Sequence, residues 1–107
     1  MSQAEVGIVA ILQTTPEKAD RLKEVLAQAA KWIHEHEPES LAFAFYEERN
    51  GDGVRISIYE RYASQAAVDK HESSDNYKKV FQTMGDEELL AGAPTILKAP
   101  FAGGFLR

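Results

Sequence analysis

The chain has 107 residues, a formal net charge of −5 from 12 basic and 17 acidic side chains, and no cysteine. Its length fits a single domain, which we predict for residues 1–107, with a core at about 5–99 and a C-terminal tail at 100–107. The acidic balance argues against nucleic acid as a partner, because phosphates attract clustered Lys and Arg. The lack of cysteine excludes disulfides, thiolate nucleophiles and thiolate metal ligands.

The N-terminal part of the chain predicts a strand followed by a long helix. Residues 5–13 are rich in Val and Ile. This apolar run is too short to cross a bilayer and has no basic leader, so we expect no membrane helix, no signal peptide and a cytoplasmic location. Thr15 and Pro16 offer a hydroxyl cap and a proline at the first helical position, and Pro38 is expected to end the helix at about Glu37.

The middle of the chain predicts a β-hairpin. Residues 41–48 and 54–62 have strand composition, and the glycine-containing segment 49–53 supplies the turn. A sheet with helices on one side and water on the other normally alternates apolar with polar residues, but the first hairpin strand is apolar on both faces. We therefore predict a homodimer in which a second copy covers the free sheet face. One face of that strand carries Leu41, Phe43 and Phe45, and the other carries Ala42, Ala44 and Tyr46.

The C-terminal half predicts two helices and a last strand. Ser64 is placed to cap a helix that runs through His71, and Ser74 to cap a second one. Residues 95–99 have the composition of a strand. The order strand, helix, strand, strand, helices, strand is that of an α+β, ferredoxin-like βαββαβ fold, with an antiparallel sheet covered by helices on one face.

The first candidate for chemistry is His71. It follows Ala67 and Val68 at spacings of four and three, so it projects from the apolar side of its helix towards the sheet. It is either a buried histidine that satisfies a backbone carbonyl or Glu60, or a general base in a pocket. Glu60 lies on the same strand face as Tyr62, where it either forms a structural pair or orients His71. We predict His71, Tyr62 and Glu60 as the catalytic residues.

The small side chains of Ala42 and Ala44 are expected to leave unfilled volume that a substrate can occupy. Aromatic residues at these spacings fit either the wall of such a pocket or a plain core. The predicted substrate-binding residues are Trp32, Tyr46, Tyr77, Phe81, Met84, Ala42 and Ala44.

No metal or cofactor is predicted. The run His34-Glu35-His36-Glu37 is rich in possible ligands, but helical residues two apart point in nearly opposite directions and cannot grip one ion. The glycine-rich nucleotide motifs and the serine-hydrolase motif are absent from the sequence.

Several segments together resemble the antibiotic-biosynthesis monooxygenase (ABM) domain family over roughly residues 5–98. The resemblance implies a dimeric α+β barrel with one pocket per protomer, between sheet and helices. The segments that carry it are Glu37-Pro38-x-x-Leu41-x-Phe43, Ile58-Tyr59-Glu60-Arg61-Tyr62 and Ala67-x-x-x-His71-x-x-Ser74-x-x-Tyr77.

The resemblance implies more than one activity, because members of this family catalyse different reactions. Some members oxidise anthrone-like or quinol-like aromatics with O₂ and no cofactor, some degrade haem, and one branch isomerises a phosphorylated sugar. The haem-degrading branch carries a tryptophan where His71 stands and its iron-ligating histidine where Phe81 stands, so haem is not expected. The expected function is a cofactor-independent monooxygenase that oxidises a small phenolic, quinol or polyketide-like aromatic with O₂, an oxidoreductase of secondary metabolism.

Two alternatives remain open at this point. One is an isomerase of a small keto-sugar phosphate that uses the same histidine to shuttle a proton. It needs cations for the phosphate, and Lys70, Lys78 and Lys79 are the nearest candidates. The other is a non-catalytic small-molecule-binding or stress-response dimer, whose pocket is small or filled and whose function does not depend on His71.

Overall fold

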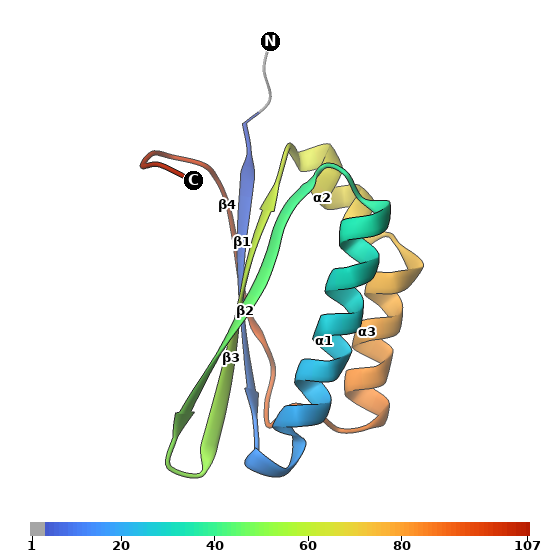
Figure 1. Ribbon diagram of the computed structural model, residues 1–107, viewed down its shortest axis with the longest axis vertical. Coiled ribbons are helices and arrows are strands. Elements are labelled where there is room, and N and C mark those ends of the chain that lie inside the picture. Colours follow the sequence, from blue (N-terminus) through green and yellow to red (C-terminus); the bar gives the residue numbers. More distant parts are fainter. Residues whose placement is uncertain (1–3) are drawn as a thin grey trace.

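The computed structural model describes residues 4–107 as a four-stranded antiparallel sheet with three helices on one face (Figure 1). The strands and helices lie close to their predicted positions. In chain order they are β1 (Val6–Thr14), α1 (Pro16–His36), β2 (Ser40–Asn50), β3 (Gly53–Tyr62), α2 (Gln65–Glu72), α3 (Asp75–Asp86) and β4 (Thr95–Pro100).

The sheet confirms the ferredoxin-like topology. Its strand order is β2-β3-β1-β4, and every neighbouring pair is antiparallel. The central strands β1 and β3 place alternate residues against the helices, and Ile8 and Ile56 on this face are almost fully buried. Helix α1 contributes the matching apolar side, with Leu22 and Leu26 buried in the same core.

Two of the three predicted helix caps form. The Ser64 hydroxyl oxygen accepts a hydrogen bond from the Ala67 N–H at 3.2 Å, and the Ser74 hydroxyl oxygen accepts one from the Tyr77 N–H at 3.1 Å. Thr15 occupies the cap position of α1 in extended conformation, but its side chain accepts no capping hydrogen bond. The start of α1 therefore depends on the proline that follows it.

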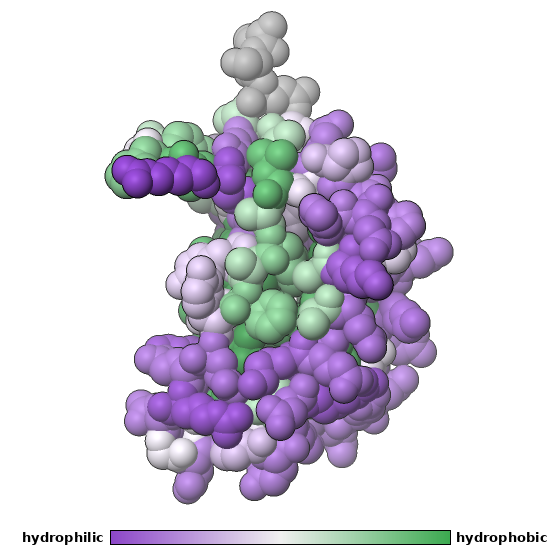
Figure 2. Space-filling view, in the orientation of Figure 1, coloured by the Kyte–Doolittle hydropathy of each residue, from purple (hydrophilic) through white to green (hydrophobic). Residues whose placement is uncertain are grey.

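The sheet face opposite the helices is largely apolar, and no helix among residues 4–107 covers it. Tyr59 and Leu97 lie on this face on either side of Val9, and they are 49% and 58% exposed. The segment after β4 leaves the sheet on the side away from the helices (Figure 1), and it exposes Phe101 and Phe105. Figure 2 shows hydrophobic surface over the strands and over this C-terminal segment.

The strand register corrects one part of the predicted pocket. Ala42, Ala44 and Tyr46 pair with Arg61, Tyr59 and Ser57, so they lie on the sheet face that points away from the helices. Because side chains alternate along a strand, Phe43 and Phe45 take the helix side instead. The two alanines therefore leave no space beneath the helices.

Within residues 4–107, no helix has the length and apolar character needed to cross a membrane.

Candidate functional site

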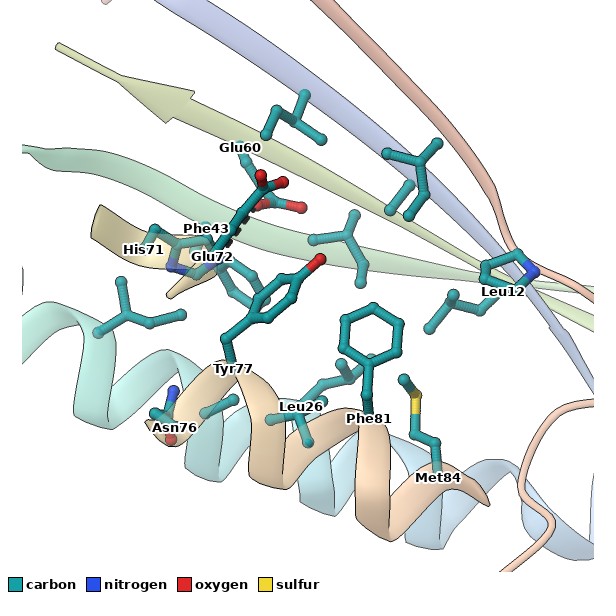
Figure 3. Close-up of a pocket in the computed structure, with 18 residues that line it drawn as sticks. Leu12, Leu26, Phe43, Glu60, His71, Glu72, Asn76, Tyr77, Phe81 and Met84 are labelled. Atoms are coloured by element: carbon teal, nitrogen blue, oxygen red, sulfur yellow. Dashed lines mark ion pairs between the residues drawn. The ribbon is translucent and has the colours of Figure 1, made fainter. Parts of the chain in front are cut away.

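A cavity of about 70 Å³ lies between the helix-facing side of the sheet and the helices, and we call it the front pocket (Figure 3). Phe81 and Ile96 line it and are 39% and 41% exposed, so it reaches the surface between α3 and β4. Most of its wall is aliphatic or aromatic. Representative members are Ile8, Ala10, Leu26, Ile58, Phe81 and Met84.

The polar groups of the front pocket gather at one end. No Lys or Arg belongs to its wall in the part of the chain that the structure describes. Glu72 forms an ion pair with Lys98, whose side chain lies outside the wall. The polar members of the wall are Glu60, His71, Glu72, Asn76 and Tyr77.

His71 is placed between two carboxylates. It belongs to α2, is only 4% exposed and faces the sheet, as its spacing from Ala67 and Val68 predicts. Its Nδ1 atom lies 2.9 Å from Glu37 Oε1, within hydrogen-bond distance. Its Nε2 atom lies 3.8 Å from Glu60 Oε1, which is an ion-pair distance but too long for a hydrogen bond (Figure 3).

Sequence reasoning missed Glu37. It directly follows α1, it is 7% exposed, and its Oε1 atom also accepts a hydrogen bond from the Ser40 hydroxyl at 2.7 Å. Its neighbours His34 and His36 are exposed, so only the last residue of the run His34-Glu35-His36-Glu37 is buried. The available signal was Pro38, which ends the helix and lets Glu37 leave the exposed side of α1.

Glu60 and Tyr62 form a buried pair on β3. The Tyr62 hydroxyl donates a hydrogen bond to Glu60 Oε1 at 2.5 Å, and Tyr62 is fully buried behind the carboxylate instead of lining the front pocket. Burial raises the pKa of Glu60, although the Tyr62 hydrogen bond and the nearby His71 oppose this. Burial and the charge of Glu60 raise the pKa of Tyr62 far above its ordinary value, so this phenol remains a donor.

Tyr77, Phe81 and Met84 extend from α3 into the wall of the front pocket (Figure 3). Burial raises the pKa of Tyr77, so its hydroxyl is also protonated at neutral pH. Trp32 lies elsewhere, in a groove between α1 and α3 where it stacks on His36 with ring centroids 4.5 Å apart. The structure thus brings His71 and Glu60 together with the three α3 residues, and it leaves Trp32 outside.

A metal ion in a protein needs several ligand side chains grouped around it. Among residues 4–107, no group of three or more His, Cys, Asp or Glu side chains is arranged to hold a metal ion.

The fold and the site define a class: a ferredoxin-like α+β protein with a mainly apolar pocket between sheet and helices, and a histidine between carboxylates at one end. The family model for antibiotic biosynthesis monooxygenases matches residues 6–83, well over half of the chain. The chain belongs to this ABM family. Among curated proteins, none matches it.

The chain is also similar to several solved structures. A proposed antibiotic biosynthesis monooxygenase from Caulobacter crescentus CB15 is 30% identical, with a TM-score of 0.84 over 94% of this chain and 92% of that one. Rv0793 from Mycobacterium tuberculosis is 23% identical, with a TM-score of 0.78 over 95% and 100% of the two chains. A further proposed monooxygenase, from Nitrosomonas europaea, is 15% identical and covers 94% and 93%, with a TM-score of 0.80. The last two show similarity of fold alone.

The buried carboxyl of Glu60 predicts a pH-dependent stability. Because its pKa is raised above the ordinary 4.5 in the folded protein, the folded state holds this proton more tightly than the unfolded chain does. The contribution of protonated Glu60 to the free energy of unfolding is complete below the ordinary pKa and is lost as the pH rises through the raised pKa of the folded state. We expect Glu60→Gln, which keeps an acceptor for Tyr62, to increase the free energy of unfolding at neutral pH and to lose this advantage in acid.

Urea denaturation of the wild type and of Glu60→Gln, from acidic to neutral pH, measures the effect. Glu35→Gln, at an exposed position of α1, is the matched control and should show no comparable trend. A difference in the free energy of unfolding between wild type and Glu60→Gln that is the same at every pH would contradict the prediction.

Proposed function

We propose that the protein is a cofactor-independent monooxygenase that oxidises a small phenolic, quinol or polyketide-like aromatic with O₂. The observation that carries this proposal is the position of His71, whose Nε2 side faces Glu60 at the polar end of an apolar pocket. Membership of the ABM family supports it. As part of the proposal, His71 is the general base, and Glu60 and Tyr62 adjust its surroundings.

The chemistry requires a substrate anion. Triplet O₂ reacts slowly with closed-shell molecules, so the substrate must first lose a proton and become rich enough in electrons to donate one. His71 accepts that proton on Nε2, and the resulting anion transfers an electron to O₂ and forms a C–O bond. When a methylene carbon is oxidised, one oxygen atom remains as a carbonyl and the other leaves as water with the two substrate hydrogens. The apolar wall keeps bulk water from the anion.

Two donors are available for the substrate oxygen. The Tyr77 hydroxyl stays protonated and points into the front pocket (Figure 3). The Asn76 side chain also lines the pocket, and its Nδ2 atom is buried without a hydrogen-bond partner. A bound oxyanion would satisfy this donor, which is costly to leave unpaired.

The size of the pocket restricts how a substrate binds. The cavity of about 70 Å³ is small compared with typical small-molecule sites, which usually measure about 300–1,000 Å³. As part of the proposal, the ring of Phe81, which is partly exposed at the mouth, turns outward when the substrate enters.

The isomerase alternative is less well supported. A sugar phosphate needs cationic partners, but the wall of the front pocket carries Glu60 and Glu72 and no Lys or Arg among the described residues. Lys70 and Lys79 line other cavities, and Lys78 is exposed. A neutral aromatic substrate fits this electrostatic pattern better than a phosphate does.

A second copy of the chain as cover for the free sheet face is also part of the proposal. The exposed side chains of Tyr46, Tyr59 and Leu97 and the apolar C-terminal segment support it, because such a patch is costly in water. A cytoplasmic location likewise stays a prediction.

We predict that Leu97→Lys converts a dimer into a monomer, because it places a charge on the apolar sheet face that the second copy is proposed to cover. Light scattering coupled to size-exclusion chromatography measures the mass. Ile96→Lys is the matched control, since Ile96 pairs with Ala10 on the opposite face of the same strand. A monomeric wild type, or a Leu97→Lys dimer, would show that a second copy does not cover this face.

Activity on a panel of anthrones, quinols and keto-sugar phosphates, with and without oxygen, tests the reaction. Turnover only in air supports the monooxygenase, turnover without oxygen supports the isomerase, and no turnover supports the binding protein.

General-base catalysis contributes about 10²- to 10⁴-fold to a rate, so His71→Ala should reduce kcat by about that factor. His34→Ala, on the exposed side of α1, should change little. A His71→Ala loss below about threefold would reject the base role.

A further inference from the structure

His71 separates two cavities. The second cavity, of about 140 Å³, lies where the end of α1 meets α2, and we call it the back cavity. Its wall includes Glu37, Ser40, Ala66, Ala67, Lys70 and His71. Among the described residues, His71 is the only one that lines both this cavity and the front pocket. Ala66 and Lys70 are exposed, so the back cavity lies next to solvent.

The two ring nitrogens of His71 have different partners. Nε2 lies towards Glu60, which lines the front pocket, and Nδ1 is hydrogen-bonded to Glu37, which lines the back cavity. Glu37 Oε1 already accepts from Ser40 and contacts His71 Nδ1, whereas Glu37 Oε2 is buried without a hydrogen-bond partner. A buried carboxylate oxygen without a partner is stabilised when a hydrogen-bond donor binds to it. The back cavity is large enough for several water molecules at about 30 Å³ each.

We propose that Glu37 and the back cavity form a proton route between His71 and solvent that bypasses the front pocket. This inference rests on the proposed role of His71 as the base. The substrate proton binds Nε2, the Nδ1 proton passes to the Glu37 carboxylate, and Glu37 releases a proton to water in the back cavity. The imidazole then carries its proton on Nε2 and is neutral, and the substrate anion remains in the front pocket.

The same path returns the proton later in the cycle. When Nε2 gives its proton to the reduced oxygen, Glu37 takes a proton from water and restores the N–H at Nδ1. No charge is gained or lost over the two steps. The base therefore exchanges protons with solvent while a substrate fills the front pocket, and no positive charge remains on the buried ring.

Solvent exchange of the His71 Nδ1 proton tests this route without any substrate. The exchange rate is measured by NMR magnetisation transfer and line broadening in protein with ¹⁵N-labelled histidine. Ala66→Leu is expected to narrow the back cavity from an exposed position, and it should slow the exchange several-fold. Glu37→Gln should slow it as well, because an amide cannot accept and release the proton as a carboxylate does.

Phe81→Trp is the matched control, since it narrows the mouth of the front pocket instead. Its exchange rate should equal that of the wild type. A signal that is too broad to detect in the wild type and sharpens only in Ala66→Leu has the same meaning as a slowed rate. Slowing by Phe81→Trp alone, or an unchanged rate in Ala66→Leu, would overturn the proposed route. Because no turnover is involved, either result is independent of whether His71 acts as a catalytic base.

Discussion

A buried imidazole held between two carboxylates is the interaction on which the rest of the site depends. His71, Glu37 and Glu60 come from α2, from the residue after α1 and from β3, and each is less than 10% exposed. Buried polar groups are costly unless they are hydrogen-bonded, so the bond between His71 and Glu37 ties α2 to the end of α1, and Glu60 of β3 packs against the other side of the ring. The Ser74 hydroxyl donates to the His71 carbonyl at 2.8 Å and caps α3, which carries Tyr77. The position of His71 is thus linked directly to the wall of the front pocket.

The front pocket combines two environments. Its polar end gathers His71 and Glu60, and burial keeps the pKa of Glu60 and of Tyr77 above their ordinary values. The remaining wall is apolar, so a charge formed at the polar end meets few competing water molecules. This arrangement is consistent with the ABM family, and among the described residues the wall presents carboxylates without free cations.

The sequence predicted the features that depend on local chemistry. Strand composition, the caps at Ser64 and Ser74, and the spacing of His71 from its apolar neighbours were sufficient for the fold and for the direction of the ring. Features that depend on distant contacts were missed. Glu37 meets His71 across 34 positions of the chain. The pocket side of β2 was assigned to Tyr46 because alternation separates two faces without saying which one the helices cover.

The protonation of His71 in the resting protein tests the central claim most directly. A long-range ¹H–¹⁵N NMR spectrum of protein with ¹⁵N-labelled histidine shows which ring nitrogen carries hydrogen. The hydrogen bond to Glu37 predicts a proton on Nδ1 and an unprotonated Nε2 facing Glu60. A neutral ring with its proton on Nε2 would contradict the claim, because no free nitrogen would then face the substrate.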